Sequence, residues 1–429
     1  MMKELQKRFE FLTGNLLILT IRQVIGMFCR MMVMPYASLY ILAVGGGTAQ
    51  IGVVNSLRPL AGLLIFPISG YLTDRTGRVK LIALAGYLSG LTMLLYVFAP
   101  SWEWIALGAL LQGFMVFQFP PSSAILADSI EPRYRGVGIA TMNTLASAFA
   151  MFSPYIAGIV LEIYGNNFGM RLLYALLVLS QLVNATIVFK FLRETAAVEK
   201  TETKFSMIAI LKEAYAGIPN LIANLPRSVK ALGVLVGTGF IANSISGPFW
   251  VVYATEVVGL SNIDWGLILL VESIFKTILT IPCGMVADKY SRAKTLFVAV
   301  LISLFSLPSM IMAKTFTHIL FIRLGAGLAG ALFFPSSTAL MADYIPRAQR
   351  GRVMAAIGRG SILIGATSGG MGGPGMGYVF TIPVMVASIV GGLLYTLNPT
   401  YPWIFILGAT MIQLISIALF IRDPENVEE

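Results

Sequence analysis

The sequence predicts an all-α membrane protein, and three observations support this fold class. Of the 429 residues, 57% are hydrophobic and only 12% are charged, whereas soluble domains carry about 25% charged residues. Apolar stretches of the length that crosses a bilayer follow one another from Leu12 to Ile421. The second half of the chain also repeats the first. A water-soluble fold is therefore excluded.

Apolar runs between turn signals predict twelve helices. They lie near residues 13–43, 50–72, 79–99, 102–127, 137–163, 170–192, 231–257, 263–286, 293–313, 316–341, 351–395 (interrupted) and 401–421. The first run follows a basic N-terminus, but Arg22 interrupts it and no small-residue cleavage site follows. It is therefore expected to be the first helix and not a cleaved signal peptide.

The eleventh segment is longer than a single span requires. It contains SGGMGGPGMG at 368–377, and Gly372, Gly373 and Pro374 cannot hold a regular helix. An insertion that acts as a hinge at the domain interface explains the excess length. The alternative is a thirteenth span, which would place the charged C-terminus outside and break the alternation of charge between loops.

Basic residues are concentrated in alternate loops. Of the 30 Lys and Arg, 21 fall at the N-terminus, in 75–80, 133–135, 193–230, 289–294 and 347–352, and at Arg422. By the positive-inside rule these segments are cytoplasmic, so both termini are expected in the cytoplasm of a multi-pass inner-membrane protein. Nucleic-acid binding is not expected, because it requires the basic residues on one continuous solvent face.

Three motifs recur at one spacing. Arg30-x4-Pro35-x4-Tyr40 returns as Asn243-x4-Pro248-x4-Tyr253, GYLTDRTGRVK at 70–80 returns as GMVADKYSRAK at 284–294, and FPPSSAILADSIEPRYRG at 119–136 returns as FPSSTALMADYIPRAQRG at 334–351. Six helices in each half give both halves the same orientation in the membrane. The expected domains are 1–192, a cytoplasmic linker at 193–229 with a short helix on the membrane surface, and 230–429.

The loop at 70–80 resembles the signature loop of the major facilitator superfamily, G-x-L-x-D-R-x-G-R. Its matching residues are Gly70, Asp74, Arg75, Gly77 and Arg78, and the second, degenerate copy keeps Gly284, Asp288 and Arg292. The resemblance implies the major facilitator fold, with two parallel six-helix bundles related by a pseudo-twofold axis along the membrane normal. It also implies that a glycine of the loop lets neighbouring helices approach closely.

The resemblance further implies a cytoplasmic gate. In the family, Asp74 would meet the start of the eleventh helix near Gly351 and Arg78 would meet Asp128, whose counterpart in the repeat is Asp343. A cluster of positive charge that only sets topology is the alternative.

The fifth helix contains Ser153-Pro154-Tyr155-Ile156-Ala157-Gly158, a relaxed version of the antiporter motif of the same family. Pro154 and Gly158 are therefore candidate hinge residues, and a packing kink is the alternative. The fourth helix lacks the arginine that the family's antiporters often carry there, whereas Arg323 occupies the corresponding place in the tenth.

Ionisable residues inside the predicted spans are the best indicators of a site, because each is costly to insert. They include Arg58, Glu272, Lys276, Arg323 and Arg359. Glu272 is the only acid near a membrane centre and is the candidate proton carrier, with Lys276, Arg58 and Arg323 as candidate partners in coupling. The alternative is a static pair between Glu272 and Lys276, one helical turn apart.

In the family, the first, fourth, seventh and tenth helices line the substrate cavity. The polar and aromatic side chains there are the candidate cavity residues: Arg30, Tyr36, Tyr40, Gln112, Gln118, Asn243, Trp250 and Tyr253. Two of the central arginines, Arg30 and Arg323, would attract an anionic or strongly polar substrate.

The expected function is secondary active transport of a small organic solute by alternating access, with proton-coupled efflux by antiport ahead of uptake or facilitated transport of an organic anion or sugar-like solute. No phosphate-binding loop of the ATPase type and no catalytic cluster is found in the sequence, so neither an enzyme nor a cofactor is expected. No metal site is expected from the single histidine, His318, and the two cysteines, Cys29 and Cys283. The expected partners are the substrate, protons and lipid, and the protein is expected to be a monomer.

Overall fold

The computed structural model describes residues 12–195, 223, 225–345, 353–354, 356–358, 364–365 and 378–423, with the backbone alone at 63–64, 66–76 and 378. The predicted linker helix, Arg359 and the glycine-rich segment with Gly372, Gly373 and Pro374 lie outside these residues. The domain boundaries and the insertion therefore stay predictions.

The N-terminal half contains six membrane-length segments. They are formed by α2 (Gly14–Val33), η1 (Met34–Tyr36) and α3 (Ala37–Ala43); by α4 (Thr48–Thr76); by α5 (Arg78–Val97); by α6 (Trp102–Phe114), η2 (Met115–Gln118) and α7 (Phe119–Asp128); and by η3 (Pro132–Tyr134), α8 (Arg135–Ala150) and α9 (Ser153–Phe191). Gly165 has φ 75° and ψ 163°, so it divides α9 into the end of the fifth segment and the whole of the sixth.

The C-terminal half follows the same order. Its helices are α12 (Arg227–Ser246), η4 (Gly247–Phe249), α13 (Trp250–Val252) and η5 (Tyr253–Val257); α14 (Asn262–Lys289); α15 (Arg292–Ser306) and η6 (Pro308–Met312); α16 (Phe316–Tyr344); η7 (Tyr378–Phe380) and α18 (Thr381–Leu397); and α19 (Tyr401–Phe420). Each predicted span thus has a counterpart, the eleventh only in its second part.

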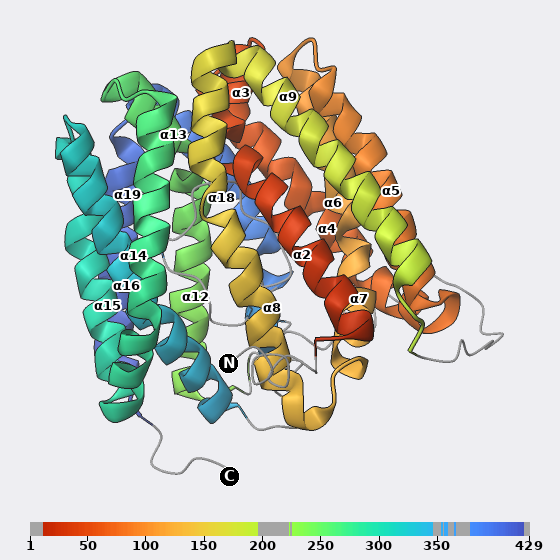
Figure 1. The fold of residues 1–429 in the computed structure, drawn as a ribbon. Coiled ribbons are helices and arrows are strands. Elements are labelled where there is room, and N and C mark those ends of the chain that lie inside the picture. The colour runs from red at the N-terminus through yellow and green to blue at the C-terminus, as the bar shows by residue number, and fades with distance from the viewer. Residues whose placement is uncertain are drawn as a thin grey trace, which may run out of the picture.

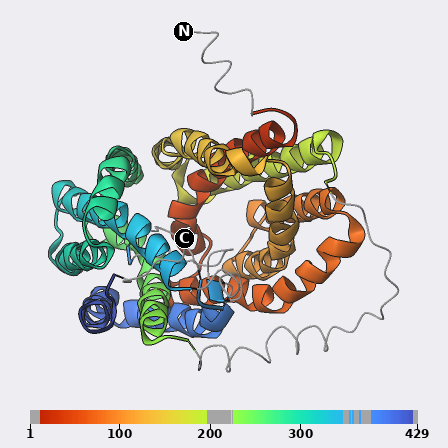
Figure 2. The same cartoon turned by 90° about the horizontal axis from the view of Figure 1, so that it is seen from below.

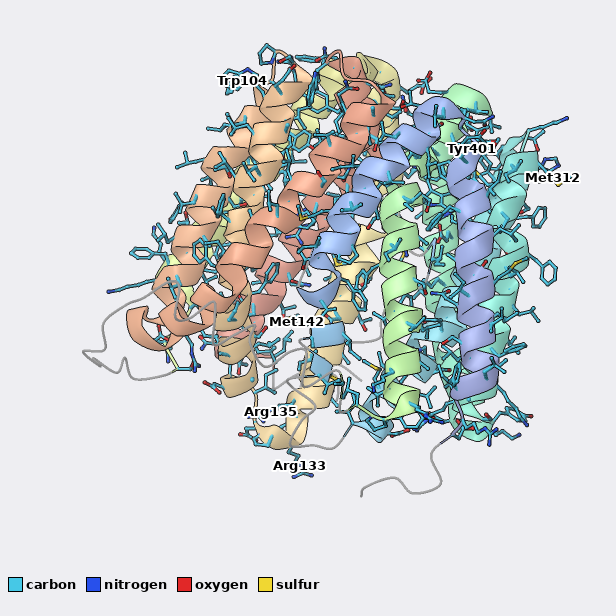
Figure 3. All side chains as sticks on the ribbon, turned by 180° about the vertical axis from the view of Figure 1, so that it is seen from behind. Trp104, Arg133, Arg135, Met142, Met312 and Tyr401 are labelled. Carbon is cyan, nitrogen blue, oxygen red and sulfur yellow. The ribbon has the colours of Figure 1, made fainter. Side chains whose placement is uncertain are left out.

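The two halves stand side by side with their helices roughly parallel (Figures 1 and 2). Among the described residues, two pairs of helices form most of the contact between them, α4 with α18 and α9 with α14, and α3 also touches α13 and η4. Basic residues mark one end of the bundle, where Figure 3 shows Arg133 and Arg135, and we call this the basic end. The opposite end holds the turns at Gly45, Gly165 and Gly259, all with positive φ.

The repeated proline of the first and seventh spans has the same structural effect in both halves. At Pro35 the α-helix tightens into η1, and at Pro248 it tightens into η4. Proline removes a backbone donor and clashes with the preceding turn, which interrupts the regular hydrogen-bond ladder. The sequence repeat is therefore also a repeat of local structure.

Among the described residues, nine helical segments are long and apolar enough to cross a membrane, and one of them, Pro132–Phe191, contains two spans divided at Gly165. The shorter apolar helix Thr381–Leu397 and the 29-residue α4 add to these. The expected all-α, multi-pass membrane fold is confirmed.

Candidate functional site

A buried ion pair joins the eighth and tenth spans. The guanidinium of Arg323 on α16 binds the carboxylate of Glu272 on α14 through two hydrogen bonds, Nε to Oε2 at 2.7 Å and Nη2 to Oε1 at 2.9 Å. Arg323 is 2% exposed and Glu272 is 7% exposed. Two parallel charge-assisted bonds fix the geometry of both side chains.

Arg323 also extends this pair toward the seventh and eleventh spans. Its Nη1 donates to the carbonyl of Gly365 at 2.8 Å, and the amide of Gly365 donates to Asn243 Oδ1 at 2.9 Å. The guanidinium lies 4.8 Å from the ring centroid of Trp250. One arginine therefore connects four spans, and a change in its position would be felt by all of them.

The alternative of a static pair between Glu272 and Lys276 is not what the structure shows, because Glu272 pairs with Arg323. Lys276 forms no ion pair among the described residues, and its Nζ lies 4.6 Å from the ring centroid of Phe334. Arg323 takes the carboxylate because its planar fork matches both oxygens, which an ammonium cannot do.

A cavity lies within the N-terminal half. Its volume is about 120 Å³, and it is partly open to solvent. The lining side chains come from the first, second, third, fourth and sixth spans: Arg30, Val33, Met34, Ala37, Ile41, Val54, Asn55, Arg58, Met93, Tyr96, Ile105, Ala109, Gln112, Tyr174 and Leu177. The only charged groups among them are the two guanidinium groups.

Most other polar groups of the cavity are already engaged. Gln112 accepts from Ser89 Oγ at 3.0 Å and donates to Ser89 O at 2.8 Å and to Thr92 Oγ1 at 2.6 Å. Asn55 donates to Ile51 O at 2.8 Å. In contrast, Arg58 Nε is buried and has no hydrogen-bond partner among the described residues. Among the described residues that line the cavity, Arg58 Nε is therefore a buried polar atom without a partner.

The predicted cavity residues divide into two groups. Arg30 and Gln112 line the cavity. The others are engaged elsewhere: Tyr36 and Tyr40 are fully buried, Tyr40 donates to Tyr96 O at 2.6 Å, Gln118 Oε1 accepts from Arg22 at 2.8 Å, and Asn243, Trp250 and Tyr253 are buried in the C-terminal half. Trp250 packs edge-on against Trp403 with ring centroids 4.4 Å apart. These six residues are not among the lining of this cavity, and their place in a substrate cavity lined by the first, fourth, seventh and tenth spans stays a prediction.

The family model of the Major Facilitator Superfamily matches residues 19–216 and 232–429. The chain belongs to this superfamily. The multidrug resistance protein MdtG of Salmonella schwarzengrund is 27% identical over 320 residues, 72% of this chain and 76% of that protein. The multi-drug resistance efflux pump PmrA homolog of Lactococcus lactis is 26% identical over 334 residues, 76% of this chain and 78% of that protein.

Solved structures of major facilitator transporters share the fold. A bacterial homolog of the human lysosomal transporter Spinster, in an inward-facing and occupied conformation, matches with TM-score 0.70 and 15% identity over 96% of this chain and 98% of that one. The xylose transporter XylE from E. coli, in an inward-open conformation, matches with TM-score 0.66 and 14% identity over 96% of each chain. The protein is therefore a membrane-embedded major facilitator transporter.

The superfamily's signature loop lies at the basic end. Arg78, which begins α5, forms an ion pair with Asp128 at the end of α7, as the resemblance implied. The repeat forms the equivalent pair between Arg292 and Asp343, and Asp288 lies 3.8 Å from Arg292. Gly77 has φ 81° and separates α4 from α5. The two halves therefore share this ion pair as well as its sequence motif.

For three other residues of the loop the structure describes the backbone alone. Gly70, Asp74 and Arg75 lie on the backbone of α4, and their side chains are not described. A Cβ added at Gly284 would meet nothing within 4 Å among the described residues, so the expected close approach is not found there. The docking of Asp74 stays a prediction.

The two halves meet closely at the opposite end. The hydroxyl of Tyr36 donates to Pro154 O at 2.8 Å, and Asn262 O of the other half lies 3.1 Å from the same hydroxyl. A Cβ on Gly158 would lie 2.5 Å from Asn262 O, and a Cβ on Gly266 would lie 2.6 Å from Pro154 O. Glycine is required at both places because the backbones of α9 and α14 approach so closely.

The same holds for the other pair of joined helices. A Cβ on Gly392 of α18 would lie 2.8 Å from Ala49 O and 3.1 Å from Gly52 Cα. Thr48 and Thr396 share a 2.7 Å hydrogen bond between their hydroxyls. Sequence reasoning missed these contacts, although the Gly391-Gly392 pair in an apolar helix was a usable signal.

Pro154 lies directly after a break in the fifth span. The fifth span breaks at Met151–Phe152, and Pro154 lies in the first turn of α9, where proline is tolerated. The break lies in the turn before the proline, where its ring and its missing N–H disturb the helix, so it fits the alternative of a packing kink. Gly158 lies at the contact between the halves described above, and the role of both residues as a hinge stays a prediction.

Proposed function

We propose that this transporter exports a small organic solute in exchange for protons, with Glu272 as the proton carrier. The observation that supports the proposal is the buried ion pair of Glu272 with Arg323. Glu272 is an acid inside the membrane, and its ion pair with Arg323 can break when the carboxylate takes up a proton. Among the relatives, the Salmonella MdtG and the Lactococcus PmrA homolog carry names that assign multidrug resistance and efflux to those proteins. Those names favour export over uptake.

The chemistry of the proposed step follows from the pair. While Glu272 is ionised, both its oxygens accept hydrogen bonds from Arg323. A proton on the carboxyl group removes its charge and occupies one oxygen, so the pair loses its charge-assisted character. Arg323 is then free to shift, and its bond to Gly365 O transmits that shift to the eleventh span. Substrate binding elsewhere needs only to favour one of the two positions of Arg323.

Alternating access would proceed by rocking of the two halves around the midplane. We infer that the basic end faces the cytoplasm, with both termini there, because basic loops are retained on that side. The opposite end, closed by Tyr36, Gly158 and Gly266, then faces outward, so the structure corresponds to a state closed to the outside. In the reverse state, the basic end would close through the loop with Asp74, Arg78 and Asp128. We infer that one chain suffices for this cycle.

Proton flux into proteoliposomes tests the proposal. An internal pH dye reports flux when an outward-directed gradient of solute is offered from a panel of cationic drugs, neutral sugars and organic anions. We expect solute-dependent proton flux for the wild type and none for Glu272→Gln. Glu103→Gln is the matched control, because Glu103 is an exposed acid in the first turn of α6. Solute-dependent proton flux in Glu272→Gln equal to that of wild type would exclude Glu272 as the carrier.

A second function has one observation in its favour. The cavity carries two positive groups and no acid among its lining residues, which fits uptake or facilitated transport of an organic anion. In that case the solute would move without proton flux, and Glu272→Gln would leave its transport rate unchanged.

A further inference from the structure

The cavity of the N-terminal half has an unusual balance of charge. Arg30 lies on α2 and Arg58 on α4, and neither belongs to an ion pair among the described residues. Arg30 is exposed to the cavity, and Arg58 Nε is buried without a hydrogen-bond partner among the residues that the structure describes. Arg323 of the other half differs, because Glu272 neutralises it.

The two arginines also repel each other and a third. Arg30 lies close enough to Arg58 and to Arg22 for the charges to interact. Arg22 has polar partners, Gln118 and Ser122, but these are neutral. Like charges brought together away from bulk water are unfavourable unless an anion compensates them. The cavity therefore has an electrostatic requirement that the described residues do not meet.

The remainder of the lining is apolar and aromatic. Nine of its fifteen residues have aliphatic or thioether side chains, and Tyr96 stacks on Tyr174 with ring centroids 4.6 Å apart. Pockets that combine an apolar wall with a few convergent polar groups are typical of sites for small organic molecules. The polar groups here are guanidinium forks, which match carboxylate, sulfonate and phosphate oxygens.

We propose that this cavity binds an organic anion whose anionic group lies between Arg30 and Arg58 and whose apolar or aromatic body lies against Tyr96 and its aliphatic neighbours. This names the substrate class and rests on the proposed function only for the inference that the bound anion is transported. A cationic compound would be repelled from the same place. The lining comes from the N-terminal half alone.

Binding to the purified full chain in a neutral detergent tests the proposal without a gradient. The probes share one apolar body and differ in charge: 2-naphthoate, 2-naphthalenemethanol and 2-naphthylmethylammonium. We expect 2-naphthoate to bind the wild type at least about tenfold more tightly than the other two, since hydrogen bonds to charged groups have effects of that order. Equal affinity for the three probes would overturn the proposal, and this comparison needs no variant.

Two variants and a control locate the site. Arg30→Gln and Arg58→Gln are each expected to weaken 2-naphthoate binding at least about tenfold, whereas Arg133→Gln, at the exposed basic end (Figure 3), should bind like wild type. Undiminished binding in both cavity variants would refute the site.

The anionic group could also come from a lipid, so binding is repeated in nanodiscs of phosphatidylcholine and of phosphatidylglycerol. Equal 2-naphthoate affinity in the two supports a soluble anion, and loss of binding in phosphatidylglycerol would overturn that assignment. Glu272→Gln should still bind 2-naphthoate. If Glu272→Gln loses proton flux but still binds 2-naphthoate, the anion site does not depend on proton coupling. If the wild type binds 2-naphthoate but shows no proton flux, proton coupling fails and the anion site stands.

Discussion

Gly266→Ala should open the end of the transporter that the structure shows closed. A Cβ at this position would lie 2.6 Å from Pro154 O, 2.7 Å from the Tyr36 hydroxyl and 2.9 Å from Tyr155 Cα, all in the other half. Ordinary contact begins near 3.4 Å, so the backbone at Pro154 must retreat by about 0.8 Å, the difference between 3.4 and 2.6 Å. A backbone carbonyl cannot yield as a flexible side chain can, and the halves must separate instead.

The size of the effect follows from the cost of overpacking, about 1–3 kcal/mol. The general preference of a helix for alanine over glycine, about 0.5–1 kcal/mol, acts in both conformations and cancels from their equilibrium. A shift of 1–3 kcal/mol changes the ratio of the two states about 5- to 150-fold. A minor open state of about 1% would therefore rise to about 5% at the lower limit and about 60% at the upper limit.

Distances between spin labels would measure this change. The labels replace Trp104 in the N-terminal half and Met312 in the C-terminal half, which are 45% and 76% exposed. Both lie toward the end opposite the basic end (Figure 3). Gly408→Ala is the control, because a Cβ there meets nothing within 4 Å. A distance distribution for Gly266→Ala that matches both wild type and Gly408→Ala, in a folded protein, would refute the steric argument.

Three further changes follow from the contacts above. Tyr36→Phe removes the hydroxyl that bridges Pro154 O and Asn262 O. The equilibrium should shift toward the open state by about 0.5–1.5 kcal/mol, which the same label pair would show as a smaller change in the distance distribution. No change would show that the bridge does not hold the halves together. Arg323→Met leaves Glu272 buried without its partner and should lower the free energy of unfolding by about 3–5 kcal/mol. The double variant with Glu272→Leu and Arg323→Met should recover most of that loss. Thermal unfolding in detergent measures both, and an equal loss in the single and the double variant would contradict this account. Asp128→Asn should change stability by less than about 1 kcal/mol, because the side chain is 43% exposed, yet slow solute flux; an unchanged rate would remove Arg78 and Asp128 from the gate.

Much of the fold was predictable because membrane helices are specified by length and apolarity, and the repeat supplied an independent check. The approximate places of the helices followed from local pattern, and the pair of Arg78 with Asp128 followed from the motif that resembles the family's signature loop. These features depend on a few neighbouring residues, so a linear sequence contains the information that determines them.

Side-chain partners were harder to predict. Lys276 was an alternative partner for Glu272 because it lies one turn away on the same helix, whereas Arg323 lies 51 residues away. A helix that is apolar on all sides has no amphipathic pattern, so its sequence does not indicate which face packs against which neighbouring helix. The aromatic side chains of the cavity, Tyr96 and Tyr174, therefore could not be distinguished from the buried Tyr36 and Tyr40.

The repeat explains why the cavity and the ion pair occur in different halves. At the offset of 214 residues that relates the halves, Arg58 corresponds to Glu272, Ala109 to Arg323 and Gly113 to Gly327. In the C-terminal half, the acid and the arginine fill the space between α14 and α16 and neutralise each other.

The N-terminal half has neither member of that pair. An arginine stands where the acid would be, and a small alanine stands where its partner would be. Arg58 and Ala109 both line the cavity. The same framework thus leaves an unfilled, positively charged space in one half and a closed, neutral pair in the other. Binding of an anion and movement of a proton are therefore expected at corresponding places of the two halves, where the residues at two corresponding positions, Arg58 and Ala109 or Glu272 and Arg323, decide which of them each half performs.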